Sequence, residues 1–280
     1  ALAVVASITQ ENLHQYAVSS LFDAATFALY AVGCLQIPVV DLVTTTVGNV
    51  MMVGMANAIH DGRETQVIDL WHQTVRRLAL VFFPLTCLLL ITARDLIVML
   101  FTESYLASVP IFMVSLTAIV FAAIPIDGLL RVYAKTRTLL AINLLRVTMI
   151  ALLIHWSITA LGLIGAIFVT MLALAFGKAI GIFSAASLWH LGIRNVLPWR
   201  VLGLIAVLSL TAGLPALAVA YGLETNPFVR IVTVGTVYVF SYVVMATGLG
   251  LLSVQERAAL SELWGRLQFF LPIRYQHKMS

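Results

Sequence analysis

Charge is scarce in this 280-residue chain. Asp, Glu, Lys and Arg together make up 10% of the residues, against about 25% in an average soluble domain. Hydrophobic residues make up 61%, and the mean hydropathy is +1.04. A sequence this poor in charge and this rich in long apolar stretches is typical of a membrane protein.

Motifs for catalysis and metal binding are also lacking. The two cysteines, Cys34 and Cys87, lie within apolar stretches without CxxC or metal-ligand spacing, so we interpret them as small core residues. The six histidines are scattered, and the chain has no HExxH, nucleophile elbow, Walker-type loop or acidic cluster of the DxD kind. We therefore expect no enzyme, no cofactor and no metal, and no transport powered by ATP bound to this chain.

The sequence does contain long apolar stretches. A bilayer core requires about 20 apolar residues per helix. Hydropathy predicts spans at 28–58, 78–101, 108–130, 138–158, 164–188, 201–221 and 228–252, with a weaker one at 1–20. These seven or eight spans predict an all-α polytopic transmembrane bundle over residues 1–255. Residues 256–280 carry leucines at helical spacing around Trp264 and are predicted to form a cytoplasmic amphipathic tail.

The cations between the spans fall in every second gap. One set of gaps carries Arg63, Arg76, Arg77, Arg131, Lys135, Arg137, Arg194, Arg200, Arg257, Arg266, Arg274 and Lys278. The other gaps, at about 21–27, 102–107, 159–163 and 222–227, are short and carry none. The positive-inside rule places the first set, and with it the C-terminus, in the cytoplasm of a multi-pass protein of the inner (plasma) membrane. Because this bias accounts for the net charge of +4, nucleic-acid binding is not supported.

Two regions are predicted to depart from a simple crossing. The stretch 28–58 would be about 46 Å long as a helix, against a hydrocarbon core of about 30 Å, so we expect one helix kinked at Pro38. The amphipathic run before residue 78, which includes Trp71, is predicted to lie along the inner surface. All five tryptophans are interpreted as interfacial anchors.

Two cations lie deep within predicted spans, where charge is costly. Lys178 is ten residues from the inner end of its span, about 15 Å by helical rise, which is farther than a lysine can reach by snorkelling. It either faces a cavity or packs against a buried partner, unless the span limits are wrong. Arg146 is about eight residues deep and shares a helical face with Asn143, so snorkelling and cavity lining both remain open.

Three further charged residues are candidates. Asp127 and Arg131 are spaced i, i+4 at the inner end of their span, as expected of a structural ion pair, with a cavity role as the alternative. Asp41 begins a polar stripe on one helical face, which includes Thr45 and Asn49 and would face a water-filled cavity or another helix. Alternatively, Asp41 bonds a neighbouring threonine or backbone freed by Pro38.

Several short segments stand out along the first crossings: Tyr30-Ala31-Val32-Gly33, Gln36-Ile37-Pro38, Val47-Gly48-Asn49-Val50-Met51, Leu100-Phe101 with Tyr105 and Ala107, and Pro110-Ile111-Phe112. Together they resemble the oligosaccharide flippase and polysaccharide-export branch of the MATE-like exporter superfamily. The resemblance implies two six-helix lobes around a central cavity, with this chain as the second, C-terminal lobe and two extra helices. The chain also begins in mid-hydrophobic sequence without Met, so we expect it to be the C-terminal part of a longer protein.

The resemblance further implies a flippase for cell-surface polysaccharide such as lipopolysaccharide. Its substrate would be a lipid-linked oligosaccharide on a polyprenyl diphosphate, moved from the inner to the outer leaflet among the membrane lipids. Lys178, Arg146 and Arg131 would bind the diphosphate, and Asp41 would exchange H⁺ or Na⁺ as coupling ion. Alternatives are a cation-coupled multidrug antiporter of the same superfamily, a membrane-embedded polysaccharide polymerase, and a structural membrane subunit. A shortage of cavity carboxylates disfavours the antiporter, and the short outer gaps disfavour the polymerase.

Overall fold

The computed structural model describes residues 13–223 and 225–251, which form helices and connecting turns without a strand. Residues 13–21 are helical, and the predicted tail at 256–280 lies outside the described residues. Seven segments are long and apolar enough to cross a membrane: α3 (Pro38–His60), α4 (Glu64–Phe101), the broken segment Glu103–Val132, α8 (Thr136–Leu161), α9 (Leu163–Leu188), α11 (Trp199–Gly222) and α12 (Pro227–Gly248). The predicted all-α transmembrane bundle is confirmed.

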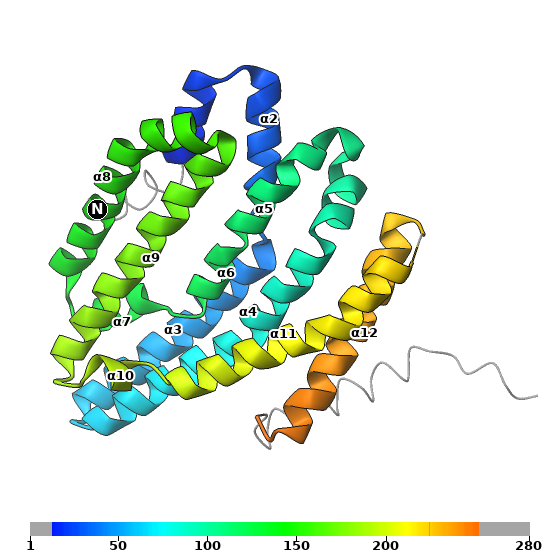
Figure 1. Cartoon of the computed structure of the whole chain (residues 1–280). Helices are drawn as coiled ribbons and strands as arrows, with labels where there is room; N and C mark the ends of the chain where they lie inside the picture. The colour runs from blue at the N-terminus through cyan, green and yellow to red at the C-terminus, as the bar shows by residue number, and fades with distance from the viewer. Residues whose placement is uncertain (1–12, 224, 252–280) are drawn as a thin grey trace, which may run out of the picture.

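The connections between these segments gather at two ends of the bundle (Figure 1). The turns after α3, before α8 and after α9 lie at one end, which carries Arg63, Arg137 and Arg194 and is called the basic end below. The 3₁₀ helix η1 (Glu103–Ser108), the α8–α9 turn and the α11–α12 connection lie toward the other. The alternation of basic and non-basic gaps is therefore built into the fold, while the placement of the basic end in the cytoplasm stays a prediction.

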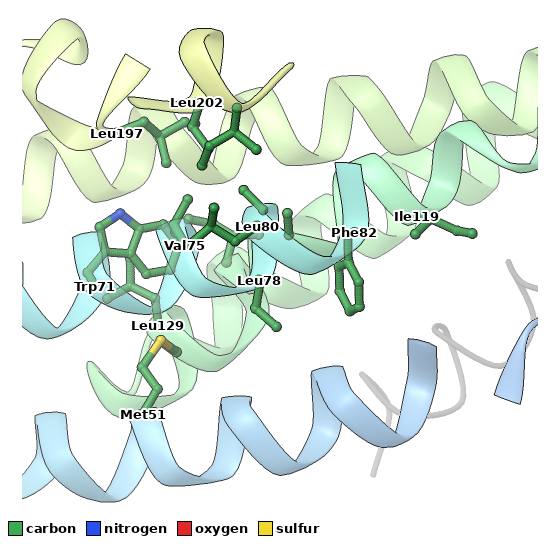
Figure 2. Packing of buried hydrophobic residues seen from close by; sticks show 14 of the residues in the cluster. Met51, Trp71, Val75, Leu78, Leu80, Phe82, Ile119, Leu129, Leu197 and Leu202 are labelled. Atoms are coloured by element: carbon green, nitrogen blue, oxygen red, sulfur yellow. The ribbon is translucent and has the colours of Figure 1, made fainter. Parts of the chain in front are cut away.

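Helix α4 runs unbroken for 38 residues and forms the centre of the largest apolar cluster. The prediction that its first turns lie along the membrane surface, with Trp71 as an anchor, is wrong. Trp71 is fully buried, and its Nε1 donates a hydrogen bond to the carbonyl of Val196, 2.8 Å away, at the end of the short helix α10 (Ile193–Val196). In Figure 2 the indole lies between Leu197 on one side and Leu129 and Met51 on the other. The apolar face that the sequence assigned to lipid is covered by protein.

The predicted kinked helix at 28–58 is two separate helices. Helix α2 (Ala24–Gly33) ends five residues before Pro38, which is the first residue of α3. Proline suits the first turn of a helix because its missing N–H would have no partner there. Gly33 packs against Ile111 so closely that a Cβ on this glycine would lie 2.6 Å from the Ile111 side chain. Packing against the next crossing therefore fixes the end of α2 beside its neighbour.

The crossing at Glu103–Val132 is made of short pieces, where the sequence predicted one span at 108–130. After η1 come α5 (Val109–Ser115), α6 (Thr117–Ala122) and α7 (Ile126–Val132). The second break falls at Ala123–Pro125, where Pro125 has no N–H to donate. Irregular backbone at this depth in a membrane is tolerated where it is buried in protein or lines a cavity, so the break marks the neighbourhood of a site.

Helices α11 and α12 form a hairpin against α4, fixed by polar contacts. Arg230 of α12 lies with its Nε 3.4 Å from Oδ2 of the buried Asp95 of α4. The Tyr242 hydroxyl donates to the Leu80 carbonyl at 3.0 Å. The ion pair accounts for a cation within a span without any role in substrate binding.

Candidate functional site

A cavity of about 680 Å³ lies between α3, the broken segment before α8, α8 and α9. All five charged candidates from the sequence line it: Asp41, Asp127, Arg131, Arg146 and Lys178. They come from four different helices and are separated by up to 137 residues in sequence. The structure therefore brings together groups that the sequence could only rank one at a time.

The wall contributed by α3 is polar. Asp41, Thr45, Gly48, Asn49 and Met52 all line the cavity, which confirms that the predicted stripe faces an internal space. Asp41 is exposed there, and within the described part of the chain it makes no hydrogen bond to Thr44 or Thr45. The Thr44 hydroxyl, which also lines the cavity, is buried without a hydrogen-bond partner among the described residues. It is a buried polar group beside the cavity whose hydrogen-bonding capacity is unused among the described residues.

Lys178 satisfies both interpretations that the sequence left open. Helix α9 ends at Leu188 as predicted, so the lysine is ten residues deep, and it lines the cavity. Its Nζ donates a hydrogen bond to the Ile124 carbonyl at 2.8 Å, and this carbonyl lies in the break between α6 and α7. The Lys178 side chain is 13% exposed and the Asp127 side chain 48%, with 3.9 Å between Nζ and Oδ2. The lysine thus joins α9 to the broken crossing.

The predicted ion pair between Asp127 and Arg131 is wrong. Among the described residues, the cation within 4 Å of the Asp127 carboxylate is Lys178. Both Asp127 and Arg131 belong to α7, but the break before this short helix brings its first turn against α9. At Gly181 a Cβ would lie 2.5 Å from the Ile126 side chain. This close contact directs Asp127 toward α9, while Arg131 stays exposed at the cavity wall.

Arg146 enters the cavity by packing on a glycine. A Cβ on Gly177 would lie 2.7 Å from Cδ of Arg146 and 3.2 Å from Cγ2 of Ile142, so the arginine stem occupies the space above Gly177. Gly177 directly precedes Lys178 in α9, so Arg146 of α8 lies beside the turn of α9 that carries Lys178. Of the two interpretations left open for Arg146, the structure favours cavity lining over snorkelling.

His14 is a cavity residue that the sequence did not single out. It is 6% exposed, lines the cavity, and its Nδ1 lies 2.7 Å from the hydroxyl of the fully buried Tyr30. The available signal was a histidine in an apolar stretch, which the weak span at 1–20 obscured. Among the residues that the structure describes, no three His, Cys, Asp or Glu side chains gather to hold a metal ion.

Comparison with known proteins gives a family match over part of the chain and a fold over most of it. Residues 1–110 match the family model described as polysaccharide biosynthesis protein. A solved structure of the lipid II flippase MurJ, in an inward closed conformation, superposes with a TM-score of 0.61 over 89% of this chain, at 15% identity. The alignment covers 52% of the flippase, so the chain spans about half the length of that protein. No curated protein matches this chain.

These findings fit the exposed apolar faces of the long helices, such as Leu152 and Phe240, which are 73% and 65% exposed and suited to lipid. The chain is a multi-pass membrane protein whose first 110 residues match the model of a polysaccharide biosynthesis family, and it shares the fold of a lipid II flippase.

Proposed function

We propose that this chain provides half of a transporter that moves a lipid-linked oligosaccharide across the membrane, with the diphosphate of a polyprenyl carrier bound in the cavity. The carrying observation is the convergence of Lys178, Arg146 and Arg131 on one cavity in a fold shared with a lipid flippase. The match of residues 1–110 to a polysaccharide biosynthesis family supports a sugar-bearing cargo.

The charges of the cavity favour an anionic ligand. Three cations against the carboxylates of Asp41 and Asp127 leave one net positive charge. Lysine and arginine bind phosphate through charge-assisted hydrogen bonds, which are about twice as strong as neutral ones. The volume of about 680 Å³ is that of a small-molecule site, so it accommodates a diphosphate and adjoining sugar while the polyprenyl chain remains in lipid.

The direction and coupling of transport belong to the same proposal. With the basic end in the cytoplasm, cargo moves from the inner to the outer leaflet. Asp41, exposed in the cavity on α3, is the group that would exchange H⁺ or Na⁺ during transport. A multidrug antiporter, in contrast, would require a cavity that is net negative.

The test is Lys178→Ala in cells that depend on this protein for surface polysaccharide. We expect export, normalised to the amount of protein in the membrane, to be abolished, because the substitution removes the Lys178 ammonium from the cavity. Lys178→Arg should keep part of the activity, since it preserves charge but not geometry. The matched control is Lys135→Ala, which removes an exposed lysine that does not line the cavity. Normal export by a well-expressed Lys178→Ala variant contradicts the proposal.

A further inference from the structure

We propose that Asp127 is an internal competitor of the substrate: its carboxylate occupies Lys178 in the empty cavity and is displaced when an anionic headgroup binds. This inference rests on the proposed function, because it assigns to the same cavity the means by which a diphosphate is taken up and released. The occupied and empty states would then differ in which anion neutralises Lys178.

The geometry of the pair is that of a weakly held partner. At 3.9 Å from Asp127 Oδ2, the ammonium group gains electrostatic stabilisation but not a hydrogen bond, which needs about 3.2 Å or less. An ammonium has three donors, and the described hydrogen bond of Lys178 is the one to the Ile124 carbonyl. A phosphate oxygen placed at hydrogen-bond distance from Nζ therefore outcompetes the Asp127 carboxylate for the remaining donors.

Burial makes the exchange one-sided. Lys178 is 13% exposed and needs a neutralising partner wherever it stands, whereas Asp127 is 48% exposed. A half-exposed carboxylate is released into the water of the cavity at small cost, while a buried lysine without a partner is strongly destabilising. Asp127 thus keeps the empty cavity stable and returns to Lys178 as the headgroup leaves.

Other charged residues of the cavity allow this idea to be separated from general electrostatics. Asp41 on α3 is a second carboxylate of the same cavity, and among the described residues it forms no ion pair with Lys178. Arg146 and Arg131 add positive charge from α8 and α7. Removal of either carboxylate makes the cavity more positive by one charge, but only removal of Asp127 frees Lys178.

The experiment measures the binding of inorganic pyrophosphate to the purified chain in detergent, by calorimetry, at fixed ionic strength. We expect Asp127→Asn to bind about tenfold more tightly than the wild type, because a charge within about 4–6 Å changes the binding of a proton by a factor of ten or more, and pyrophosphate binds the same ammonium as the Asp127 carboxylate. Asp41→Asn should change the affinity clearly less, and Lys178→Gln should lose binding alone and in combination with Asp127→Asn.

Thermal unfolding of the same samples distinguishes competition from a structural role. If Asp127 has a structural role, the Asp127→Asn variant should lose both thermal stability and affinity for pyrophosphate. If Asp127 is a competitor, the variant should lose thermal stability without ligand but bind pyrophosphate more tightly. If Asp127→Asn does not fold, Asp127→Glu retains a competitor with a longer arm and should bind no more tightly than the wild type; tighter binding overturns the inference.

The two levels of the proposal fail differently. Wild-type binding that depends on Lys178 but is not strengthened by Asp127→Asn overturns the competitor role alone. An equal gain from Asp41→Asn does the same, because it reduces the effect to net charge. Absence of pyrophosphate binding by every folded variant overturns the proposed headgroup site, and the competitor role with it.

Discussion

Single glycines decide where the cavity cations lie. Gly177 provides the space for the Arg146 stem, and an alanine methyl there would come within 2.7 Å of Arg146 Cδ. Because the obstructed atom belongs to a flexible side chain, the arginine moves rather than the helices. Alanine in a helix interior is also favoured over glycine by about 0.5–1 kcal/mol.

We therefore expect Gly177→Ala to weaken pyrophosphate binding several-fold while the free energy of unfolding stays level or rises. Gly203→Ala in α11 is the matched control, because a Cβ there meets nothing within 4 Å. Calorimetric affinity and thermal unfolding in detergent provide the two readouts. Unchanged affinity for Gly177→Ala would show that Arg146 does not need its present position to bind an anion.

The sequence was sufficient to nominate the cavity residues but not to pair them. Depth within a span identified Lys178 and Arg146, and helical spacing placed Asp41 on an inward face. The partner of Lys178 could not be predicted, because it depends on the break at Ala123–Pro125, which turns Asp127 of α7 toward α9. A rule for i, i+4 neighbours assumes one continuous helix.

Among the elements, the limits of some crossings were predicted, but the early start of α4 and the interruptions of other crossings were not. The limits of α9 and α11 agree with hydropathy within two residues, because apolar length is dictated by the bilayer. Proline predicted a kink in 28–58, but the first helix ends at Gly33, where it packs against Ile111 on another crossing, and a second helix begins at Pro38. Tertiary contacts of this kind leave no local signature in the sequence.

The start of α4 offers a test of its buried packing. Trp71→Phe keeps an aromatic ring but removes the donor to the Val196 carbonyl. We expect a loss of about 1–3 kcal/mol in the free energy of unfolding, because a buried hydrogen bond is lost and the smaller ring leaves a space in the core, while His72 Nε2 stays 3.2 Å from the same carbonyl. Thermal or denaturant unfolding in detergent measures it. Trp156→Phe, at a residue 68% exposed on α8, should cost far less; equal effects would return Trp71 to an interfacial role.

At the scale of the whole molecule, the alternation of basic and non-basic gaps predicts sidedness. Glu103 precedes α5 at the end opposite the basic end, and Arg137 lies in the first turn of α8 at the basic end; both are exposed. In intact cells we expect a membrane-impermeant maleimide to label Glu103→Cys but not Arg137→Cys, with both labelled after permeabilisation. The unsubstituted protein controls for Cys34 and Cys87. The reverse pattern would place the basic end outside.

Fold class was the most predictable property of the molecule, because the bilayer permits few solutions for so apolar a chain. The assignment to a second lobe, in contrast, stays a prediction, since the flippase match covers 52% of that protein and establishes the fold. What the sequence could not supply is the assembly of a cavity from four helices, which depends on close contacts at Gly177 and Gly181.

Neighbouring crossings of this molecule differ in mechanical character. Helix α4 has 38 residues and is about 57 Å long at 1.5 Å per residue. Because it is continuous, we expect it to move as one rigid body from the end beside α10 to the end beside η1. The crossing from Glu103 to Val132 is a series of short helices with breaks at Leu116 and at Ala123–Pro125. We therefore expect a displacement of α7 to be taken up at the break at Ala123–Pro125, so that the cavity wall changes shape while α4 keeps its place.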